Sequence, residues 1–89
     1  MKNKVLIKLL VPEIDNTFDI FIPTNELIWK IKKLLIKSIN DLNNGILNVS
    51  NDYILINKKT GQIYSNNETI FNSDIRNATE LILFTEKKV

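Results

Sequence analysis

The sequence contains neither cysteine nor histidine, and each absence removes a class of function. Without cysteine the chain can form no disulfide bond and no thiolate metal site, which suits a reducing compartment. Without histidine it lacks the commonest general base and the commonest metal ligand of proteins. Glycine occurs only twice, and neither Gly45 nor Gly61 lies in a phosphate-binding motif. We therefore expect no catalysis, no metal site and no cofactor.

The net charge is small, and long apolar runs are absent. The net charge of +2 is too small to indicate a concentrated basic face for nucleic acid. No stretch approaches the roughly 20 apolar residues of a membrane span. The apolar run at residues 5–11 contains Lys8 and lacks the small-residue cleavage site of a secretory signal. We expect a cytoplasmic protein with no nucleic-acid partner and no direct membrane insertion.

The length of 89 residues fits one domain with a single modest core. We expect this domain to span residues 1–89, with an ordered core at about 4–85 and a frayed tail at 86–89.

The first half of the chain predicts a hairpin followed by a helix. Residues 5–11 and 18–22 are β-rich runs that end at Pro12 and Pro23, and a short polar link between them favours antiparallel pairing. Thr24 and Asn25 both suit a helix N-cap, and from Leu27 the apolar period changes to about 3.6. A broad arc of apolar positions is expected to face the core: Leu27, Ile28, Ile31, Leu34, Leu35, Ile39 and Leu42. The helix should end near residues 43–45.

The second half predicts three more strands, at residues 53–56, 62–64 and 80–84. The predicted order is therefore β-β-α-β-β-β, an α+β class. One helix would cover one face of a mixed sheet, with the first and last strands adjacent at its centre.

The end of the sequence resembles ubiquitin. The ubiquitin spacing T-L-x₄-I-x₃-S-x-L-x-L is reproduced by Thr69-Ile70, Ile75, Thr79, Leu81 and Leu83. The resemblance extends from Val5 to Phe84 and rests mostly on core positions. It implies the ubiquitin-like β-grasp fold, but says little about function.

A narrower resemblance is to the small ubiquitin-like proteins of Gram-positive type VII (WXG100) secretion systems, the YukD/EsaB type. Phe18-Asp19-Ile20 matches their Phe-Asp-Leu strand, and residues 74–79 partly match their Gly-Ile-x-Asn-Gly-Asp turn. Asp74 stands where glycine is usual, and Ala78-Thr79 stands where Gly-Asp is usual. The resemblance implies an accessory or regulatory protein that contacts the cytoplasmic part of a membrane component.

The C-terminal sequence differs from that of ubiquitin-like modifiers. Conjugating and sulfur-carrying relatives end in Gly-Gly, whereas this sequence ends in Lys87-Lys88-Val89. We therefore expect neither covalent conjugation nor sulfur transfer.

Surplus apolar residues predict a protein-binding surface on the sheet. Alternation places Leu6 and Leu10 on the same face as Lys4 and Lys8, which marks that face as outward. The same alternation predicts that Phe21, Ile82 and Phe84 also face outward. The proposed patch is Leu6, Leu10, Phe21, Ile82 and Phe84. It would bind a partner protein or a second copy in a homodimer. Alternatively the tail, the 46–52 connector or lysine stems cover it.

A weaker candidate lies on the helix. Trp29 and Ile36 are seven residues apart, so they share a side that points away from the core arc. They would form a small protein-binding anchor among lysines, for which an acidic partner is a weak hypothesis. Alternatively they are ordinary surface residues, or the connector packs on them.

Overall fold

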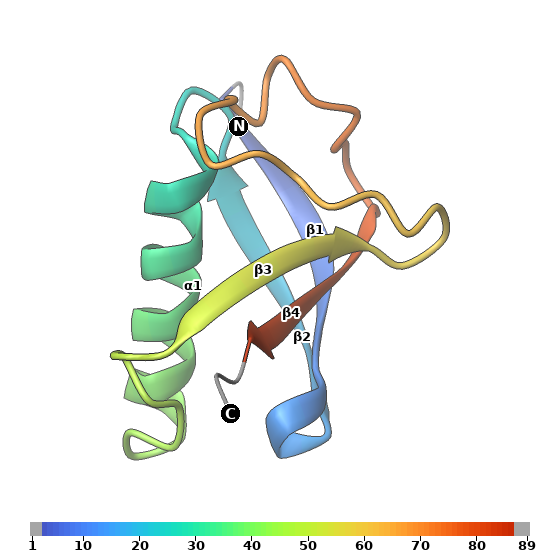
Figure 1. Ribbon diagram of the computed structural model, residues 1–89. Helices are drawn as coiled ribbons and strands as arrows, with labels where there is room; N and C mark the ends of the chain where they lie inside the picture. Colours follow the sequence, from blue (N-terminus) through green and yellow to red (C-terminus); the bar gives the residue numbers. More distant parts are fainter. Residues whose placement is uncertain (1–2, 87–89) are drawn as a thin grey trace.

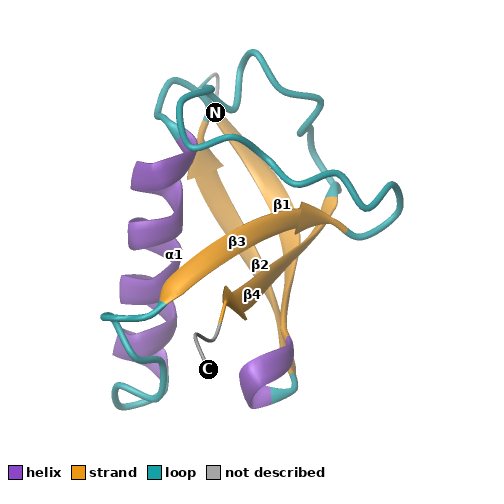
Figure 2. Cartoon of the chain, in the orientation of Figure 1, coloured by secondary structure: helices purple, strands orange, loops and turns teal. Residues whose placement is uncertain are grey.

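The computed structural model describes residues 3–86, in which one helix lies across one face of a four-stranded sheet (Figures 1 and 2). Along the chain the elements are β1 (Lys4–Val11), a 3₁₀ turn (Pro12–Ile14), β2 (Asn16–Pro23), α1 (Ile28–Leu42), β3 (Asp52–Asn57) and β4 (Glu80–Glu86). The strand order is β2-β1-β4-β3, with β1 and β4 parallel at the centre and the other neighbours antiparallel. The predicted α+β class and the central pairing of the first and last strands are confirmed.

The fourth predicted strand is not a strand. In residues 3–86 the segment 62–64 makes one isolated bridge, between Ile56 and Ile63. Two hydrogen bonds flank it: the Asn57 N–H donates to the Gln62 carbonyl (2.8 Å), and the Tyr64 N–H donates to the Leu55 carbonyl (3.0 Å). The bridge stands alone among the described residues, and the Tyr64 side chain is buried in the core. The sheet therefore has four strands where the sequence predicted five.

The helix begins later than predicted, at Ile28, and its N-cap is Leu27 rather than Thr24 or Asn25. The first amides of a helix have no acceptor within the helix and need one elsewhere. Here the Ile28 N–H donates to the Glu68 carbonyl (2.9 Å), and the Trp29 N–H donates to the Asn66 carbonyl (3.3 Å). A loop distant in sequence therefore sets the start of the helix.

The core lies between α1 and the sheet. The helix contributes a stripe of buried side chains, which meets buried positions of all four strands, among them Ile7, Leu9, Ile22, Leu55, Leu81 and Leu83. The prediction that Leu34 and Leu42 belong to this core is wrong, because both are exposed. Leu34 lies at the margin of the apolar arc, and Leu42 is the last residue of the helix.

A partly buried polar network holds the long connection between β3 and β4. The Tyr64 hydroxyl donates to Oδ1 of Asp74 (2.6 Å) and accepts from Nδ2 of Asn57 (3.1 Å). Oδ1 of Asn57 in turn accepts the amides of Lys59 and Thr60 at 2.9 and 3.1 Å. Burial, with the Asp74 carboxylate as a further cause, raises the pKa of Tyr64 to about 12.

This network predicts a loss of stability at high pH. The Tyr64 pKa rises from 10.0 to about 12 on folding, so the unfolded chain releases this proton first. The stabilisation is complete below pH 10 and is lost as the pH rises toward 12, with a limit of about 2–3 kcal/mol. Urea unfolding of the wild type and Tyr64→Phe at several pH values measures it. We expect the variant to lose part of the alkaline decrease, and an unchanged decrease would contradict the assignment.

Candidate functional site

Apolar side chains from three strands lie together on the outer face of the sheet, opposite α1. Leu10 of β1 is paired in register with Ile82 of β4, and Ile82 is paired with Ile56 of β3. Phe84 of β4 is paired with Ile54 of β3. Paired residues on neighbouring strands project to the same face and touch one another. These five side chains therefore form one continuous surface.

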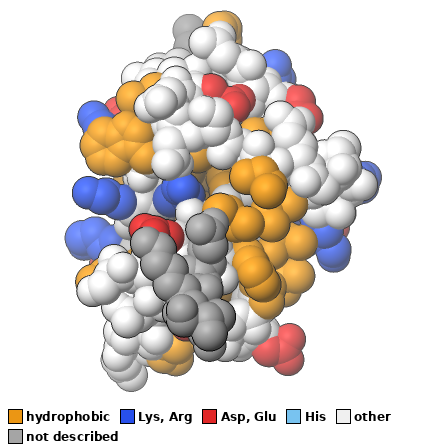
Figure 3. Space-filling model, viewed as in Figure 1, with side chains coloured by type: hydrophobic (Ala, Val, Ile, Leu, Met, Phe, Trp, Pro, Cys, Tyr) orange, Lys and Arg blue, Asp and Glu red, His pale blue; other side chains and the backbone are white. Residues whose placement is uncertain are grey.

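Ile63 extends this surface beyond the edge of the sheet. Its bridge to Ile56 places the two side chains on the same face, and Ile63 is exposed. We call the set the sheet-face patch; its members are Leu10, Ile54, Ile56, Ile63, Ile82 and Phe84. Figure 3 shows hydrophobic side chains gathered over the C-terminal half of β3. The sequence analysis did not include Ile54 and Ile56 in the predicted patch. The alternation along β3 could have identified them, because Tyr53 and Leu55 are buried and the isoleucines between and after them face outward.

Leu6 and Phe21 form a separate pair rather than part of this patch. They are partners in the β1–β2 register and both are exposed. In the next row Lys8 forms an ion pair with Asp19 (Nζ to Oδ1, 3.5 Å), and Lys8 is also paired with Glu80 across the sheet. This charged row separates Leu6 from Leu10. The expected outward orientation is thus observed, but the expectation of one contiguous patch is wrong.

The Leu6–Phe21 pair borders a hollow of about 430 Å³ that also includes Asn77 and Ala78. Oδ1 of Asn77 accepts the Leu6 N–H, and the Ala78 N–H donates to the Leu6 carbonyl, each at 2.8 Å. The segment before β4 thus continues the pairing with β1. To do so Ala78 adopts a φ of +70°, a left-handed conformation that is unfavourable for any residue with a Cβ atom.

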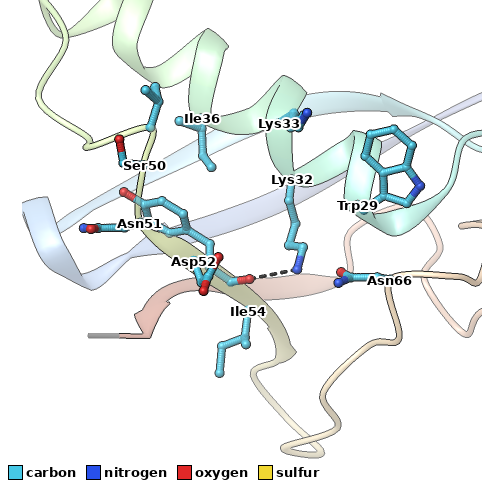
Figure 4. A pocket seen from close by; sticks show the side chains of 11 residues that line it. Trp29, Lys32, Lys33, Ile36, Ser50, Asn51, Asp52, Ile54 and Asn66 are labelled. Atoms are coloured by element: carbon cyan, nitrogen blue, oxygen red, sulfur yellow. Dashed lines mark hydrogen bonds between the residues drawn. The ribbon is translucent and has the colours of Figure 1, made fainter. Parts of the chain in front are cut away.

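Of the two helix residues predicted to form a binding anchor, one is exposed and one is buried. Trp29 is 37% exposed, and the ammonium groups of Lys30 and Lys33 lie 5.5 and 5.3 Å from its ring. Ile36 is only 8% exposed, so the prediction that it faces solvent is wrong. The cause is the connector after the helix, which Asn40 fixes to α1: its side chain donates to the Leu47 carbonyl (2.9 Å) and accepts the Leu47 N–H (2.7 Å). In Figure 4 this connector and β3 lie beside the helix at Ile36.

Three further expectations concern features outside these surfaces. Within residues 3–86, no group of three or more carboxylates is arranged to hold a metal ion. In the same part of the chain, no helix combines the length and the apolar character needed to cross a membrane. The predicted frayed tail and the Lys87-Lys88-Val89 terminus lie outside the described residues, apart from Glu86, whose backbone belongs to β4.

Comparison with known proteins identifies the fold. No protein-family model matches the sequence, and no curated protein matches it. Among solved structures, the chain resembles part of the MycP5-free ESX-5 inner membrane complex, with a TM-score of 0.80 and 12% identity over 98% of this chain. This chain spans 22% of that protein. It also resembles the EccD5 ubiquitin-like domain from Mycobacterium xenopi, with a TM-score of 0.69 and 11% identity over 97% of this chain and 98% of that one.

A further match shows that the same fold occurs in other settings. A chain of the toluene 4-monooxygenase HD complex has a TM-score of 0.75 and 7% identity, over 93% of this chain and 99% of that one. Several other matches are named as ubiquitin-like domains. Identities this low demonstrate a shared fold alone. The chain thus has the ubiquitin-like β-grasp fold, as the sequence resemblance implied.

The conformation of Ala78 predicts a stabilising substitution. Because glycine adopts positive φ without steric cost, Ala78→Gly should raise the free energy of unfolding by about 1 kcal/mol. Ala78→Val, which adds a β-branched side chain at the same φ, should lower it by at least as much. Thermal unfolding followed by circular dichroism measures both. A stabilising valine, or a destabilising glycine, would contradict the assigned conformation.

Proposed function

We propose that this protein is a noncovalent protein-interaction module and an accessory or regulatory ubiquitin-like component of a type VII secretion system. The observation that carries the proposal is the sheet-face patch. An antiparallel-type sheet that faces water on one side normally has polar residues there, and contiguous apolar surface usually indicates a binding site. Here three neighbouring strands contribute isoleucine, leucine and phenylalanine to that face.

Phe84 is the proposed anchor of the binding site. It is exposed, and Ile54 and Ile82 lie beside it. Aromatic side chains that become fully desolvated at the centre of an interface commonly contribute 2 kcal/mol or more to binding. The Lys8–Asp19 row and the Leu6–Phe21 pair would lie at the rim, where charges favour one orientation of the partner.

Two similarities support the secretion assignment. One is the partial match of residues 18–20 and 74–79 to the YukD/EsaB type. The other is the likeness to the EccD5 ubiquitin-like domain and to part of an ESX-5 inner membrane complex. We propose that the protein acts in the cytoplasm as a single domain over residues 1–89, and that its partner is the cytoplasmic part of a secretion-system membrane component.

The alternative is an unrelated ubiquitin-like adaptor or a homodimer that uses the same face. The adaptor alternative is supported by the occurrence of this fold in a chain of a monooxygenase complex. A second copy could bury the sheet-face patch equally well, since two apolar surfaces are mutually complementary. Sedimentation of the purified protein distinguishes a homodimer from a secretion component or an adaptor. Neighbouring genes for WXG100 proteins or FtsK-type ATPases would favour the secretion component over the adaptor.

Charge introduced at the anchor should abolish binding while the fold is retained. We expect Phe84→Asp to weaken the partner's binding by at least about tenfold, because an aspartate in the patch would have to be desolvated. Isothermal titration calorimetry against the purified cytoplasmic part of the secretion-system membrane component measures the change in affinity. The matched control is Leu42→Asp, which places the same charge at a residue 72% exposed on the helix.

The two variants test the docking site and the homodimer separately. If Phe84→Asp and the control bind alike, the sheet-face patch is not the docking site. If the wild type sediments as a dimer that Phe84→Asp dissociates, the homodimer replaces the secretion partner.

A further inference from the structure

The outer side of β2 is a free strand edge. The strand order places β2 at one end of the sheet, with β1 as its neighbour. Leu6 of β1 uses its backbone on the opposite side, because its N–H and its carbonyl both bond to residues 77–78. Its register partner Phe21 therefore directs its own N–H and carbonyl away from β1. The same alternation leaves the backbone of Asp19 and the carbonyl of Pro23 on this edge.

This edge has few of the features that normally prevent a strand edge from pairing with another chain. Such features are short length, bulges, lysines, prolines and a covering segment. Strand β2 has eight residues, contains no lysine and pairs with β1 in an uninterrupted register. Its one charged residue, Asp19, forms an ion pair with Lys8. Its one proline, Pro23, is the last residue of the strand, and its carbonyl can still accept a hydrogen bond.

The apolar side chains of this edge are complementary to a second copy of the same edge. Leu6 and Phe21 are register partners on the outer face, and they are 37% and 54% exposed. If two copies of β2 pair antiparallel with Phe21 opposite Phe21, these side chains form one apolar row that crosses the junction. Each copy then covers the apolar pair that the other leaves exposed.

The charges on either side of this row are complementary as well. In the same register Asp19 lies opposite Pro23 of the second copy, and Lys4 is the partner of Pro23 within each copy. Lys4 is exposed, and within residues 3–86 it forms no ion pair. Asp19 therefore lies between Lys8 of its own chain and Lys4 of the second copy, about 10 Å across the sheet. Aspartate and lysine side chains together can span that distance.

We propose that the protein self-associates through this edge, with two copies of β2 paired antiparallel about a twofold axis at Phe21. Each Phe21 N–H donates to the Phe21 carbonyl of the second copy, and each Asp19 N–H donates to its Pro23 carbonyl. The two four-stranded sheets become one continuous sheet. A strand of another protein could form the backbone bonds, but the symmetric apolar row with a charged row on each side requires two identical edges.

Other registers of the same pairing are less favourable. A twofold axis at Asp19 places two carboxylates directly opposite each other, which is destabilising. It also requires the Thr17 N–H, which already donates to Oδ1 of Asn16 (2.9 Å). An axis at Ile20 places Asp19 opposite Phe21 and interrupts the apolar row. The pairing centred on Phe21 avoids all three conflicts.

Self-association through this edge leaves the sheet-face patch free. The twofold axis is perpendicular to the sheet, so the patches of both copies lie on one face and both helices lie on the other. A partner with two matching sites would bind such a pair of patches more tightly than a single one. This consequence rests on the proposed binding role of the patch, whereas the self-association does not.

Single-cysteine variants test the register, because the chain contains no cysteine. Phe21→Cys places the two Cα atoms about 5.5 Å apart, which suits a disulfide bond. Asp19→Cys places them about 14 Å apart, which is too far. We expect Phe21→Cys to form covalent dimers under mild oxidation at least about tenfold faster than Asp19→Cys. The surface control is Leu42→Cys, at a residue 72% exposed on the helix, and it should be as slow as Asp19→Cys.

Sedimentation equilibrium tests the dimer without a covalent bond. The dimer fraction of the wild type should rise with protein concentration. Phe21→Asp should weaken the dimer by at least about tenfold, because it replaces the central aromatic pair with two opposed carboxylates. Phe84→Asp should leave the dimer unchanged. Circular dichroism of each variant verifies that the fold is retained.

Three results would overturn the proposal. The first is a folded wild type that remains monomeric up to about 1 mM. The second is cross-linking of Asp19→Cys or Leu42→Cys that is as fast as that of Phe21→Cys. The third is a dimer that Phe84→Asp dissociates and Phe21→Asp does not, which would assign the second copy to the sheet-face patch. None of these outcomes depends on a secretion partner, so the self-association and the secretion assignment can fail separately.

Discussion

The parallel pairing of β1 with β4 is the constraint on which both the core and the surfaces depend. It joins the two ends of the chain, and its register sets Leu9 beside Leu81 and Leu10 beside Ile82. The first pair is buried under the helix and the second lies on the outer face. Because side chains alternate along a strand, a slip of one residue would exchange the two faces. One register therefore determines both the packed interior and the apolar exterior.

The long connection between β3 and β4 makes that parallel pairing possible. It leaves the edge of the sheet, passes the start of the helix and returns to the centre (Figure 1). Its polar groups are used along the way: Tyr64 holds Asp74, the Glu68 carbonyl accepts the Ile28 amide, and Asn77 accepts the Leu6 amide. Asp74 takes a structural role that glycine could not, whereas Ala78 keeps the left-handed conformation at a cost in stability.

The two candidate surfaces lie on either side of β3 and differ in chemistry. The outward-facing isoleucines of β3 contribute to an apolar patch, while the other side of the strand borders a hollow beside α1 that is lined by both lysine and aspartate. Apolar contact provides most of the binding free energy at an interface, whereas charge provides orientation and discrimination between partners.

The sequence by itself determined the α+β class, the hairpin, the amphipathic helix and the outward orientation of Leu6 and Phe84, because each follows from a local period of two or 3.6 residues. The tertiary structure decided what lies beside those residues. Ile36 is buried because the connector between the helix and β3 packs along the helix. The helix starts at Ile28 because a later loop accepts its first amides. Strand register joined Ile54 to the patch and separated Leu6 from it. Periodicity orients a side chain within its own element, whereas its neighbours depend on long-range pairing that no local pattern encodes.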